Sequence, residues 1–392
     1  METWILGVLL YLLCFSESFV MKLIYLTSKK YPSKTADHFF IKEMANRFGD
    51  ILKENFSLVL ANNFSDHFKK IKVINLGLKR ESGRTFYYFF WLLFFVAKAR
   101  LNGSQISFFS NDPNLLCNLI MLRKIFGFKY KICSEWHILY DDWRDSFIVR
   151  NSDFVVATSN LLMRMIAKKA NVKIDKEKFL VVYGGVNLEK YPERDIWELR
   201  KELDLPEDKI LAAYVGLFKT LGVKKSIDVM INALAYLPEN VNMVFVGGKK
   251  EEIAEYSEQI PDKKLLNRCI FIEKQETDRV PLYQKAVDIL VIPNPDKYPF
   301  NDYCIPMKIY EYLASRKPII YSNLALLSEV LADCGFSFTP DDPKDLARAI
   351  LFTLNSDSEI INKKIQVCLD RASRYSWENR AETILNFLKI KY

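Results

Sequence analysis

Residues 303–322, YCIPMKIYEYLASRKPIIYS, predict a short helix that runs directly into a buried strand. Pro306 suits the first helical position, because the N–H group that proline lacks would have no intrahelical partner there. Pro318 ends the helix, and the apolar residues 319–321 form the strand. The inward face of the helix carries apolar side chains spaced three and four residues apart, at Met307, Tyr310 and Ala314.

Glu311 lies in the second turn of this helix, beyond a helix start that attracts anions through its free N–H groups and its dipole. Its separation from Pro306 is about 7–8 Å along the axis at ~1.5 Å per residue, close to the span from a diphosphate to the ribose of one nucleotide. We therefore predict that Lys308 and the helix start face phosphates while Glu311 accepts hydrogen bonds from ribose hydroxyls. The alternative is an amphipathic helix with a solvent-exposed ion pair.

A second stretch, residues 215–228 (VGLFKTLGVKKSID), places a glycine after a strand and then a lysine-rich loop before a helix. Cations at a helix start are unfavourable for the helix dipole unless an anion bridges them. The loop therefore predicts a phosphate contact through Lys219, Lys224 or Lys225. The alternative is a basic loop that is simply solvated.

Residues 306–320, PMKIYEYLASRKPII, resemble the P-x-K-x-x-E-Y-x-A-x-x-K-P-I-I signature of retaining glycosyltransferases of the GT-B fold, family 4 type. In that family the helix carries two glutamates eight residues apart, and the second holds the ribose of the sugar donor. Glu311 matches the second glutamate. Tyr303 stands at the first, so this chain departs from the family at the sugar end of the donor site.

The family also has a strand, a glycine and then a K-G-x-D element whose lysine holds the donor diphosphate. Residues 225–228, KSID, resemble this element with serine in place of glycine, which implies that Lys225 contacts the diphosphate beside Gly216. Leu217 stands where the family has an arginine, and Lys219 is the predicted substitute.

His137 follows a predicted strand in the sequence SEWH, two residues after Glu135. Ligands of parallel α/β sheets bind outside the carboxyl ends of the strands, so His137 is placed to contact sugar hydroxyls. The E-x-H element of the resembling family implies the same role, binding of the transferred sugar. The alternative is a structural histidine.

The length of 392 residues predicts two to three domains, and a composition of 50% hydrophobic and 27% charged residues is that of a soluble globular protein. The seven cysteines are scattered, odd in number and without a C-x-x-C pair. They favour reduced thiols in a cytoplasmic setting. With only three histidines as well, we predict no metal site.

Residues 1–20 contain an apolar run that no Lys or Arg precedes, unlike the basic start of a secretory signal. The run from Trp4 to Cys14 is also short for a bilayer span. We interpret these residues as a loosely attached leader ahead of the strand that opens at Met21. A membrane anchor is the alternative.

From Met21 onward, strands alternate with helices in two series, which predicts two doubly wound Rossmann-like domains facing a central cleft, the GT-B form of the α/β class. We place the first domain at residues 21–187 and the second at 188–376, with the final helix, 377–392, folding back toward the first as it does in the resembling family. The predicted strands are residues 21–27, 57–61, 106–110, 129–133, 154–157 and 180–182, then 210–215, 241–246, 269–272, 288–293 and 319–321.

The charge is divided unequally between the two halves. Residues 1–187 hold 27 Lys and Arg against 16 Asp and Glu, a net charge of +11, and residues 188–392 hold 29 against 32, a net charge of −3. This asymmetry points to an anionic partner for the first domain. No nucleic-acid motif is present, so we predict peripheral contact with a membrane, to which the aromatic helix at residues 85–99 would contribute. The alternative for that helix is burial in the core.

These features and the resemblance together predict a metal-independent, retaining glycosyltransferase. The donor is a UDP- or GDP-linked sugar, the acceptor is a glycan or a lipid-linked molecule, and no cofactor is needed beyond the nucleotide sugar as co-substrate. Two alternatives remain, a sugar-nucleotide epimerase of the same fold and a non-catalytic binding protein. The predicted catalytic residues are His137, Lys225 and Glu311, and the predicted donor-binding residues are Gly216, Lys219, Lys225, Tyr303, Lys308 and Glu311.

Overall fold

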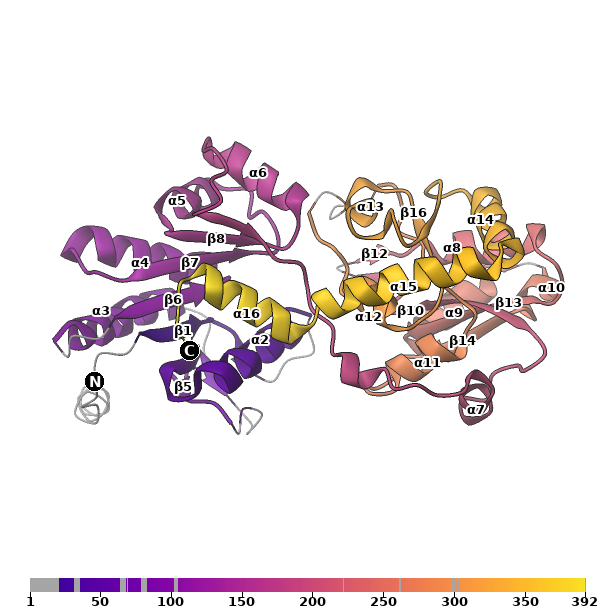
Figure 1. The fold of residues 1–392 in the computed structure, drawn as a ribbon, viewed down its shortest axis with the longest axis horizontal. Coiled ribbons are helices and arrows are strands. Elements are labelled where there is room, and N and C mark those ends of the chain that lie inside the picture. The colour runs from indigo at the N-terminus through magenta and orange to yellow at the C-terminus, as the bar shows by residue number, and fades with distance from the viewer. Residues whose placement is uncertain are drawn as a thin grey trace. The chain divides into compact units, whose positions relative to one another are not determined.

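The computed structural model describes residues 21–31, 36–63, 68, 70–78, 83–101, 105–220, 222–260, 262–297, 301 and 303–391. The predicted leader, residues 1–20, lies outside them. The described chain forms two compact units (Figure 1). The first runs up to Tyr183 and also takes in the residues from Trp377 onward, and the second is Gly184–Ser376. The break falls between Tyr183 and Gly184, a few residues before the boundary predicted at 187/188.

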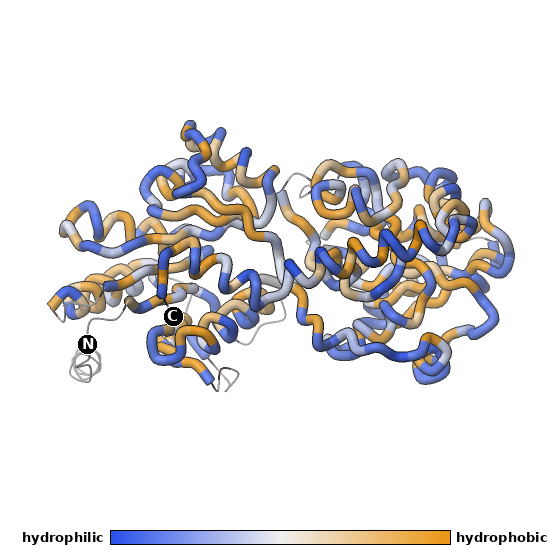
Figure 2. The backbone as a smooth tube through the Cα atoms, viewed as in Figure 1, coloured by the Kyte–Doolittle hydropathy of each residue, from blue (hydrophilic) through white to orange (hydrophobic). Residues whose placement is uncertain are grey.

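The first unit is built on a parallel sheet that has seven strands within the described residues, in the order β5-β3-β1-β6-β7-β8-β9. Every residue of β3, β6 and β8 is buried, as expected for strands covered by helices on both faces (Figure 2). The strands are β1 (Lys22–Leu26), β3 (Phe56–Leu60), β5 (Val73–Asn75), β6 (Ile106–Ser110), β7 (Lys131–Trp136), β8 (Phe154–Ala157) and β9 (Phe179–Val181), with the short pair β2 (Lys30–Tyr31) and β4 (Asn62–Asn63) beside them.

The helices of the first unit begin where the sequence supplies caps. Asp112 caps α4 and Ser159 caps α6 by accepting backbone N–H groups of the first turn. In the chain, α3 packs against α4, α4 against α5, α5 against α6, and the final helix α16 against α2. The helices are α2 (Ala36–Leu52), α3 (Arg84–Leu101), α4 (Pro113–Phe126), α5 (Trp143–Asn151), α6 (Asn160–Ala170) and α16 (Trp377–Phe387), with a short 3-10 helix η1 (Lys53–Asn55) after α2.

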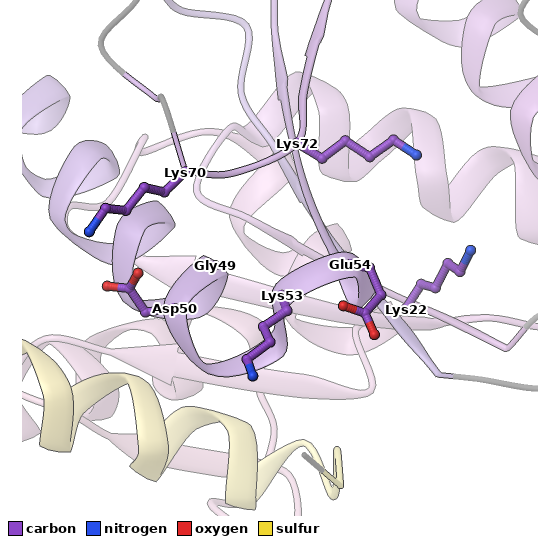
Figure 3. Close-up of a pocket in the computed structure, with 7 residues that line it drawn as sticks. All are labelled: Lys22, Gly49, Asp50, Lys53, Glu54, Lys70 and Lys72. Carbon is purple, nitrogen blue, oxygen red and sulfur yellow. The ribbon is translucent and has the colours of Figure 1, made fainter.

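A hollow of about 600 Å³ opens at the amino end of this sheet, where Lys22 begins β1 and Lys72 precedes β5 (Figure 3). None of the predicted site residues lines it. Its wall carries four lysines and two carboxylates on exposed or partly exposed side chains: Lys22, Asp50, Lys53, Glu54, Lys70 and Lys72, with Gly49 between them.

The second unit is built on a parallel sheet in the order β14-β13-β10-β15-β16-β17, six strands within the described residues. A small antiparallel hairpin, β11 paired with β12, follows β10. The strands are β10 (Ile210–Val215), β11 (Lys219–Thr220), β12 (Val223–Lys224), β13 (Val241–Gly248), β14 (Cys269–Glu273), β15 (Ile289–Ile292), β16 (Ile319–Ser322) and β17 (Phe336–Phe338).

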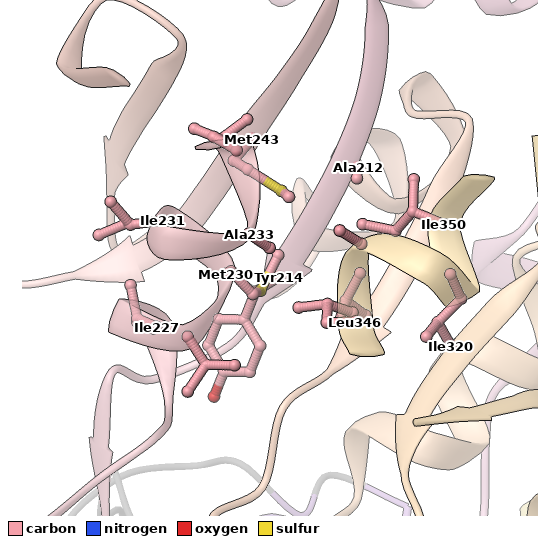
Figure 4. Packing of buried hydrophobic residues seen from close by; sticks show 14 of the residues in the cluster. Ala212, Tyr214, Ile227, Met230, Ile231, Ala233, Met243, Ile320, Leu346 and Ile350 are labelled. Carbon is pink, nitrogen blue, oxygen red and sulfur yellow. The ribbon is translucent and has the colours of Figure 1, made fainter. Parts of the chain in front are cut away.

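The core of this unit lies between one face of the sheet and the helices α8 and α14 (Figure 4). Tyr214 and Met243 come from the sheet, Met230 from α8, and Leu346 and Ile350 from α14. The helices are α7 (Ile196–Glu202), α8 (Ile227–Ala233), α9 (Lys250–Glu258), α10 (Lys263–Leu266), α11 (Val280–Ala286), α12 (Lys308–Ala314), α13 (Ala325–Leu331), α14 (Pro343–Asn355) and α15 (Ser358–Arg374), with the 3-10 helices η2 (Leu188–Lys190) and η3 (Leu234–Tyr236).

Both sheets reverse their direction of winding at one place, as doubly wound sheets do. The chain moves from β1 to β3 and β5 on one side and then to β6 on the other, and from β10 to β13 and β14 before β15. Ligands of such sheets bind beyond the carboxyl ends of the strands at this switch point. Gly216, directly after β10, lies at the switch point of the second unit.

The helix of residues 303–322 starts later than predicted. The structure begins α12 at Lys308 rather than at Pro306. The N–H groups of Ile309 and Tyr310 donate to the carbonyl oxygens of Pro306 and Met307, both at 3.1 Å, so the entry is a turn with three-residue spacing. Local sequence fixes the helix to within a turn, and the tighter entry moves its first α-helical residue.

Candidate functional site

Lys308 reaches back from α12 to the end of β10. Its Nζ donates a hydrogen bond to the hydroxyl of Tyr214 and lies 3.8 Å from the centre of that ring. A Cβ atom on Gly216 would stand 2.5 Å from this Nζ, so the glycine at the switch point makes room for the ammonium group. Sequence analysis predicted both residues in the donor site, and the structure brings them into contact.

Lys225 is the second cation at this place, with 4% of its surface exposed. Its backbone N–H donates to Phe218 O at 2.9 Å. The next residue, Ser226, donates its N–H to Pro293 O at 3.1 Å and its hydroxyl to Asp341 Oδ1 at 2.8 Å. These bonds hold the lysine loop against the segment that follows β15, at the switch point.

Burial lowers the pKa of both ammonium groups. It lowers the pKa of Lys225 to about 8. It also lowers the pKa of Lys308 well below the ordinary lysine value, and the positive charge of Lys225 lowers it further. Two like charges in a low-dielectric site are stabilised by an anion between them, which would raise both pKa values again.

Glu311 lies one turn after Lys308 on α12 and is half-buried. Burial raises its pKa, and a hydrogen bond from Gln284 and the charge of Lys308 oppose that rise. Gln284 Nε2 donates to Glu311 Oε2 at 3.3 Å, and the hydroxyl of Tyr191 donates to Gln284 Oε1 at 2.7 Å. Tyr191 and Gln284 were not predicted, because nothing in their local sequence marks them.

Lys219 has a different setting from the one predicted for it. Its Nζ lies 2.8 Å from Glu255 Oε2, and Lys224 Nζ lies 2.5 Å from Glu255 Oε1. Hydrogen bonds from Lys219 and Lys224 lower the pKa of Glu255 to about 2. The two hairpin lysines therefore form ion pairs with Glu255 of α9. Lys308 is the lysine that lies against Gly216, next to Leu217 in the sequence.

Tyr303 lies in the partly buried segment that precedes α12. Its neighbour Cys304 is close enough to Lys225 for the ammonium charge to oppose the rise that burial causes in the pKa of the thiol. Cys304 was not predicted as part of the site, and only its place beside Tyr303 could have suggested it.

His137 belongs to the first unit, where it follows β7. Its Nε2 lies 3.3 Å from Oε2 of Glu135, which also pairs with the buried Arg380 of α16. Burial opposes the negative charge of Glu135, but Arg380 and His137 outweigh it, and the pKa of the carboxyl is lowered. The ring of Phe40 packs edge-on against His137 at 4.3 Å. The imidazole is thus held in place while 29% of its side chain stays exposed.

Arg380 also donates to the carbonyl oxygens of Val182 and Tyr183, both at 2.5 Å. This explains why residues from Trp377 onward belong to the first unit. Among the described residues, no group of three or more His, Cys, Asp or Glu side chains could hold a metal ion. Likewise, in the part of the chain that the structure describes, every helix is too short or too polar to cross a membrane.

Known proteins share both the sequence pattern and the fold. Residues 195–366 match the model of the family described as glycosyl transferases group 1. The D-inositol 3-phosphate glycosyltransferase of Stackebrandtia nassauensis is 24% identical over 268 residues, covering 64% of this chain and 58% of that protein. The O-antigen chain mannosyltransferase RfbU of Salmonella typhimurium is 24% identical over 244 residues, covering 61% of this chain and 60% of that protein. The chain therefore spans less than two thirds of the length of these curated relatives.

Among solved structures, Anabaena Alr3699/HepE in complex with UDP has a TM-score of 0.70 and 18% identity, covering 94% of this chain and 100% of that one. This likeness confirms the predicted fold, two Rossmann-like units of the GT-B type. The segment that matches the glycosyl transferases group 1 model, residues 195–366, contains Gly216, Lys225, Lys308 and Glu311.

Proposed function

We propose that the protein is a glycosyltransferase that moves a sugar from a nucleotide-diphosphate sugar to a glycan or lipid-linked acceptor with retention of configuration. One observation carries the proposal: the buried Lys225 and the half-buried Lys308 gather beside Gly216 at the switch point, with Glu311 one turn further along the same helix. Two cations next to a carboxylate match a diphosphate next to a ribose diol.

In this proposal the chemistry is mainly electrostatic. As the bond from the sugar to the diphosphate breaks, negative charge grows on the leaving group, and the ammonium groups of Lys225 and Lys308 stabilise it. Lys308 takes the place that sequence analysis gave to Lys219, because it lies against Gly216 while Lys219 pairs with Glu255. The acceptor attacks from the face that the leaving group vacates, as the resemblance implies. No metal ion is needed for this charge compensation.

His137 of the first unit is proposed to bind hydroxyls of the transferred sugar. Its partners support this role, because the buried Glu135 and the ring of Phe40 fix the imidazole while leaving part of it exposed at the end of β7. The donor base is proposed to be uracil or guanine. UDP is bound by the Anabaena protein of the same fold, and inositol phosphate and O-antigen glycosyltransferases are among the relatives.

The function is tested by incubating the protein with UDP- and GDP-linked sugars and measuring release of the nucleoside diphosphate. We expect release to be slow with donor alone and to rise at least about tenfold with a suitable glycan or lipid-linked acceptor. Conversion of the donor to its epimer without an acceptor would instead favour the epimerase alternative. Tight nucleotide binding with no turnover across a broad acceptor panel would favour the non-catalytic alternative.

We also propose that the first unit docks on the cytoplasmic face of an anionic membrane, where a lipid-linked acceptor would lie. Helix α3 is not buried on all sides. Its inward face is formed by Tyr88, Trp91, Leu92 and Val96. A second stripe, which we call the α3 stripe, consists of Phe86, Phe90, Phe94 and Leu101. Three of these side chains, Phe86, Phe94 and Leu101, are exposed by 70%, 46% and 86%.

The adjoining helix α4 also carries exposed apolar side chains. Met121, Ile125 and Phe126 are exposed on it, and α4 packs against α3. Exposed cations lie among these side chains at Arg100 and Lys124. Apolar side chains interspersed with cations suit the interface of an anionic bilayer, at about 1 kcal/mol per basic residue near the surface. The net charge of +11 in residues 1–187 supports the same partner.

Vesicle co-sedimentation tests the docking surface, using protein that begins at Met21. We expect binding to vesicles of phosphatidylglycerol and phosphatidylcholine at low salt, weaker binding at high salt, and little binding to phosphatidylcholine alone. The triple variant Phe86→Ser, Phe94→Ser and Leu101→Ser should reduce vesicle binding at least about tenfold. Phe352→Ser, an exposed position on α14 of the second unit, is the matched control and should bind normally.

Protein that ignores anionic vesicles even at low salt would contradict the docking proposal and favour a soluble acceptor. If the triple variant and Phe352→Ser lose vesicle binding equally, the α3 stripe is not the docking surface. Self-association that the triple variant abolishes would assign the stripe to a second copy of the chain instead.

A further inference from the structure

We propose that Gln284 and Tyr191 are positioning residues that orient the carboxylate of Glu311, and so set the affinity for the nucleotide. The proposal rests on the ribose role given to Glu311 above and adds the two residues through which the fold controls that role. Neither touches the nucleotide in this scheme, and each acts through the next side chain.

The three side chains come from three separate elements of the second unit. Tyr191 directly follows η2, Gln284 lies on α11 and Glu311 on α12. The Tyr191 hydroxyl donates to Gln284 Oε1 at 2.7 Å, and Gln284 Nε2 donates to Glu311 Oε2 at 3.3 Å. Gln284 is fully buried and Tyr191 is 8% exposed, so water has little access to replace either bond.

The two hydrogen bonds determine which way the side-chain amide of Gln284 points. A side-chain amide can present either its oxygen or its NH₂ group to a neighbour. Because the Tyr191 hydroxyl donates to Gln284 Oε1, the NH₂ group is turned toward Glu311, where it can donate to the carboxylate. Without that hydroxyl the amide oxygen loses its donor, and the contact with Glu311 alone holds the NH₂ group in place, so the amide is oriented less firmly.

The bond from Gln284 also matters because Glu311 is half-buried. Burial raises the pKa of Glu311, and the Gln284 hydrogen bond lowers it, followed by the charges of Lys308 and Lys190. An ionised carboxylate accepts stronger hydrogen bonds than a protonated one. With Oε2 bound to Gln284, Oε1 remains available to ribose hydroxyls. The titratable groups that act on Glu311 from its own and neighbouring elements are Lys190, Tyr191, Lys308 and Tyr312.

The test is a double-mutant cycle on the full chain, with UDP and GDP affinities measured by calorimetry. Gln284→Met keeps the length of the side chain and removes the donor, and it should weaken binding about tenfold, the loss of one hydrogen bond to a charged group. Tyr191→Phe should weaken binding about threefold. The double variant should bind no more weakly than Gln284→Met alone, because Tyr191 acts only through Gln284.

The pH profile separates positioning from a merely structural role. Loss of a donor to the carboxylate raises the pKa of Glu311, so the acid loss of nucleotide affinity should move to higher pH in Gln284→Met. Raising the pH should then restore part of its affinity. Tyr321→Phe, which removes another buried hydroxyl of this unit, is the control and should keep the wild-type profile.

Additive effects of the two substitutions, or an unchanged pH profile in Gln284→Met, would overturn the inference. Tyr191→Phe is a small change and tests it even if Gln284→Met folds poorly, which thermal unfolding would detect. Glu311→Ala separates this failure from that of the proposed function. If Glu311→Ala leaves nucleotide affinity unchanged, the ribose assignment itself fails, whereas a large effect there with none in Gln284→Met removes only the positioning role.

Discussion

Glu311→Ala is expected to weaken binding of the nucleotide at least about a hundredfold. In the proposed site its carboxylate accepts two hydrogen bonds from the ribose diol, and hydrogen bonds to charged groups contribute about 1.5–3 kcal/mol each. Calorimetry with UDP and GDP measures the loss. Glu359→Ala, on an exposed position of α15 in the same unit, is the matched control and should bind as the wild type does.

The ligand offers a second control for the same bonds. With a nucleotide that lacks both ribose hydroxyls, the wild type and Glu311→Ala should differ by less than about threefold, because the partner of the carboxylate is gone. If the variant loses as much affinity for this analogue as for UDP, Glu311 stabilises the site in some other way. Unchanged affinity for UDP itself would remove the ribose assignment.

Lys225→Ala is expected to lower turnover by about 10²–10³, the effect of removing one group that stabilises developing negative charge. Its partner is the leaving diphosphate, so binding of uridine or guanosine should change little while binding of UDP or GDP weakens. Steady-state kinetics together with calorimetry check both parts. Lys224→Ala is the matched control, because that neighbouring lysine is bound to Glu255 and should leave activity nearly unchanged.

The pH dependence follows from the state of the same lysine. Lys225 must carry its proton to hold the diphosphate, and burial lowers its pKa to about 8. The value of kcat/KM should therefore fall as the pH rises through about 8. Lys225→Arg keeps the charge at all working pH values, so its profile should lose this decline even if its rate is lower. A decline that persists in Lys225→Arg would assign it to another group.

Two further measurements separate the role of Lys225 from that of His137 and from that of a metal ion. His137→Ala, in the first unit, should lower turnover while leaving nucleotide affinity intact, which separates contacts with the sugar from contacts with the diphosphate. Activity should also persist in a chelator, since protein cations supply the charge compensation. Activity that disappears in the chelator and returns with magnesium would contradict metal independence and reduce the role left to Lys225.

The sequence alone determined the α/β class and most of the strands. The predicted strands at residues 106–110, 154–157 and 210–215 coincide with β6, β8 and β10. A strand that is buried on both faces is a short, nearly continuous run of apolar residues, so the local sequence is enough to locate it. It also located the Lys308 and Glu311 helix and the lysine loop, since each is a local motif. It missed α9, α13 and α15 altogether and placed the start of α12 two residues early.

The tertiary structure alone decided which partners these residues have. Gln284 and Glu311 are 27 residues apart, Tyr191 and Gln284 are 93 apart, and Arg380 and Glu135 are 245 apart. No local spacing encodes such pairs, because they form only when elements far apart in the chain pack together in the folded unit.

The same reason applies to Lys219 and to α3. A lysine on a loop and an aromatic helix each have several stable settings. In the fold, Lys219 pairs with Glu255 of α9, and one stripe of α3 stays exposed. Periodicity specifies which side chains share a face of a helix, but only tertiary packing decides which face is covered.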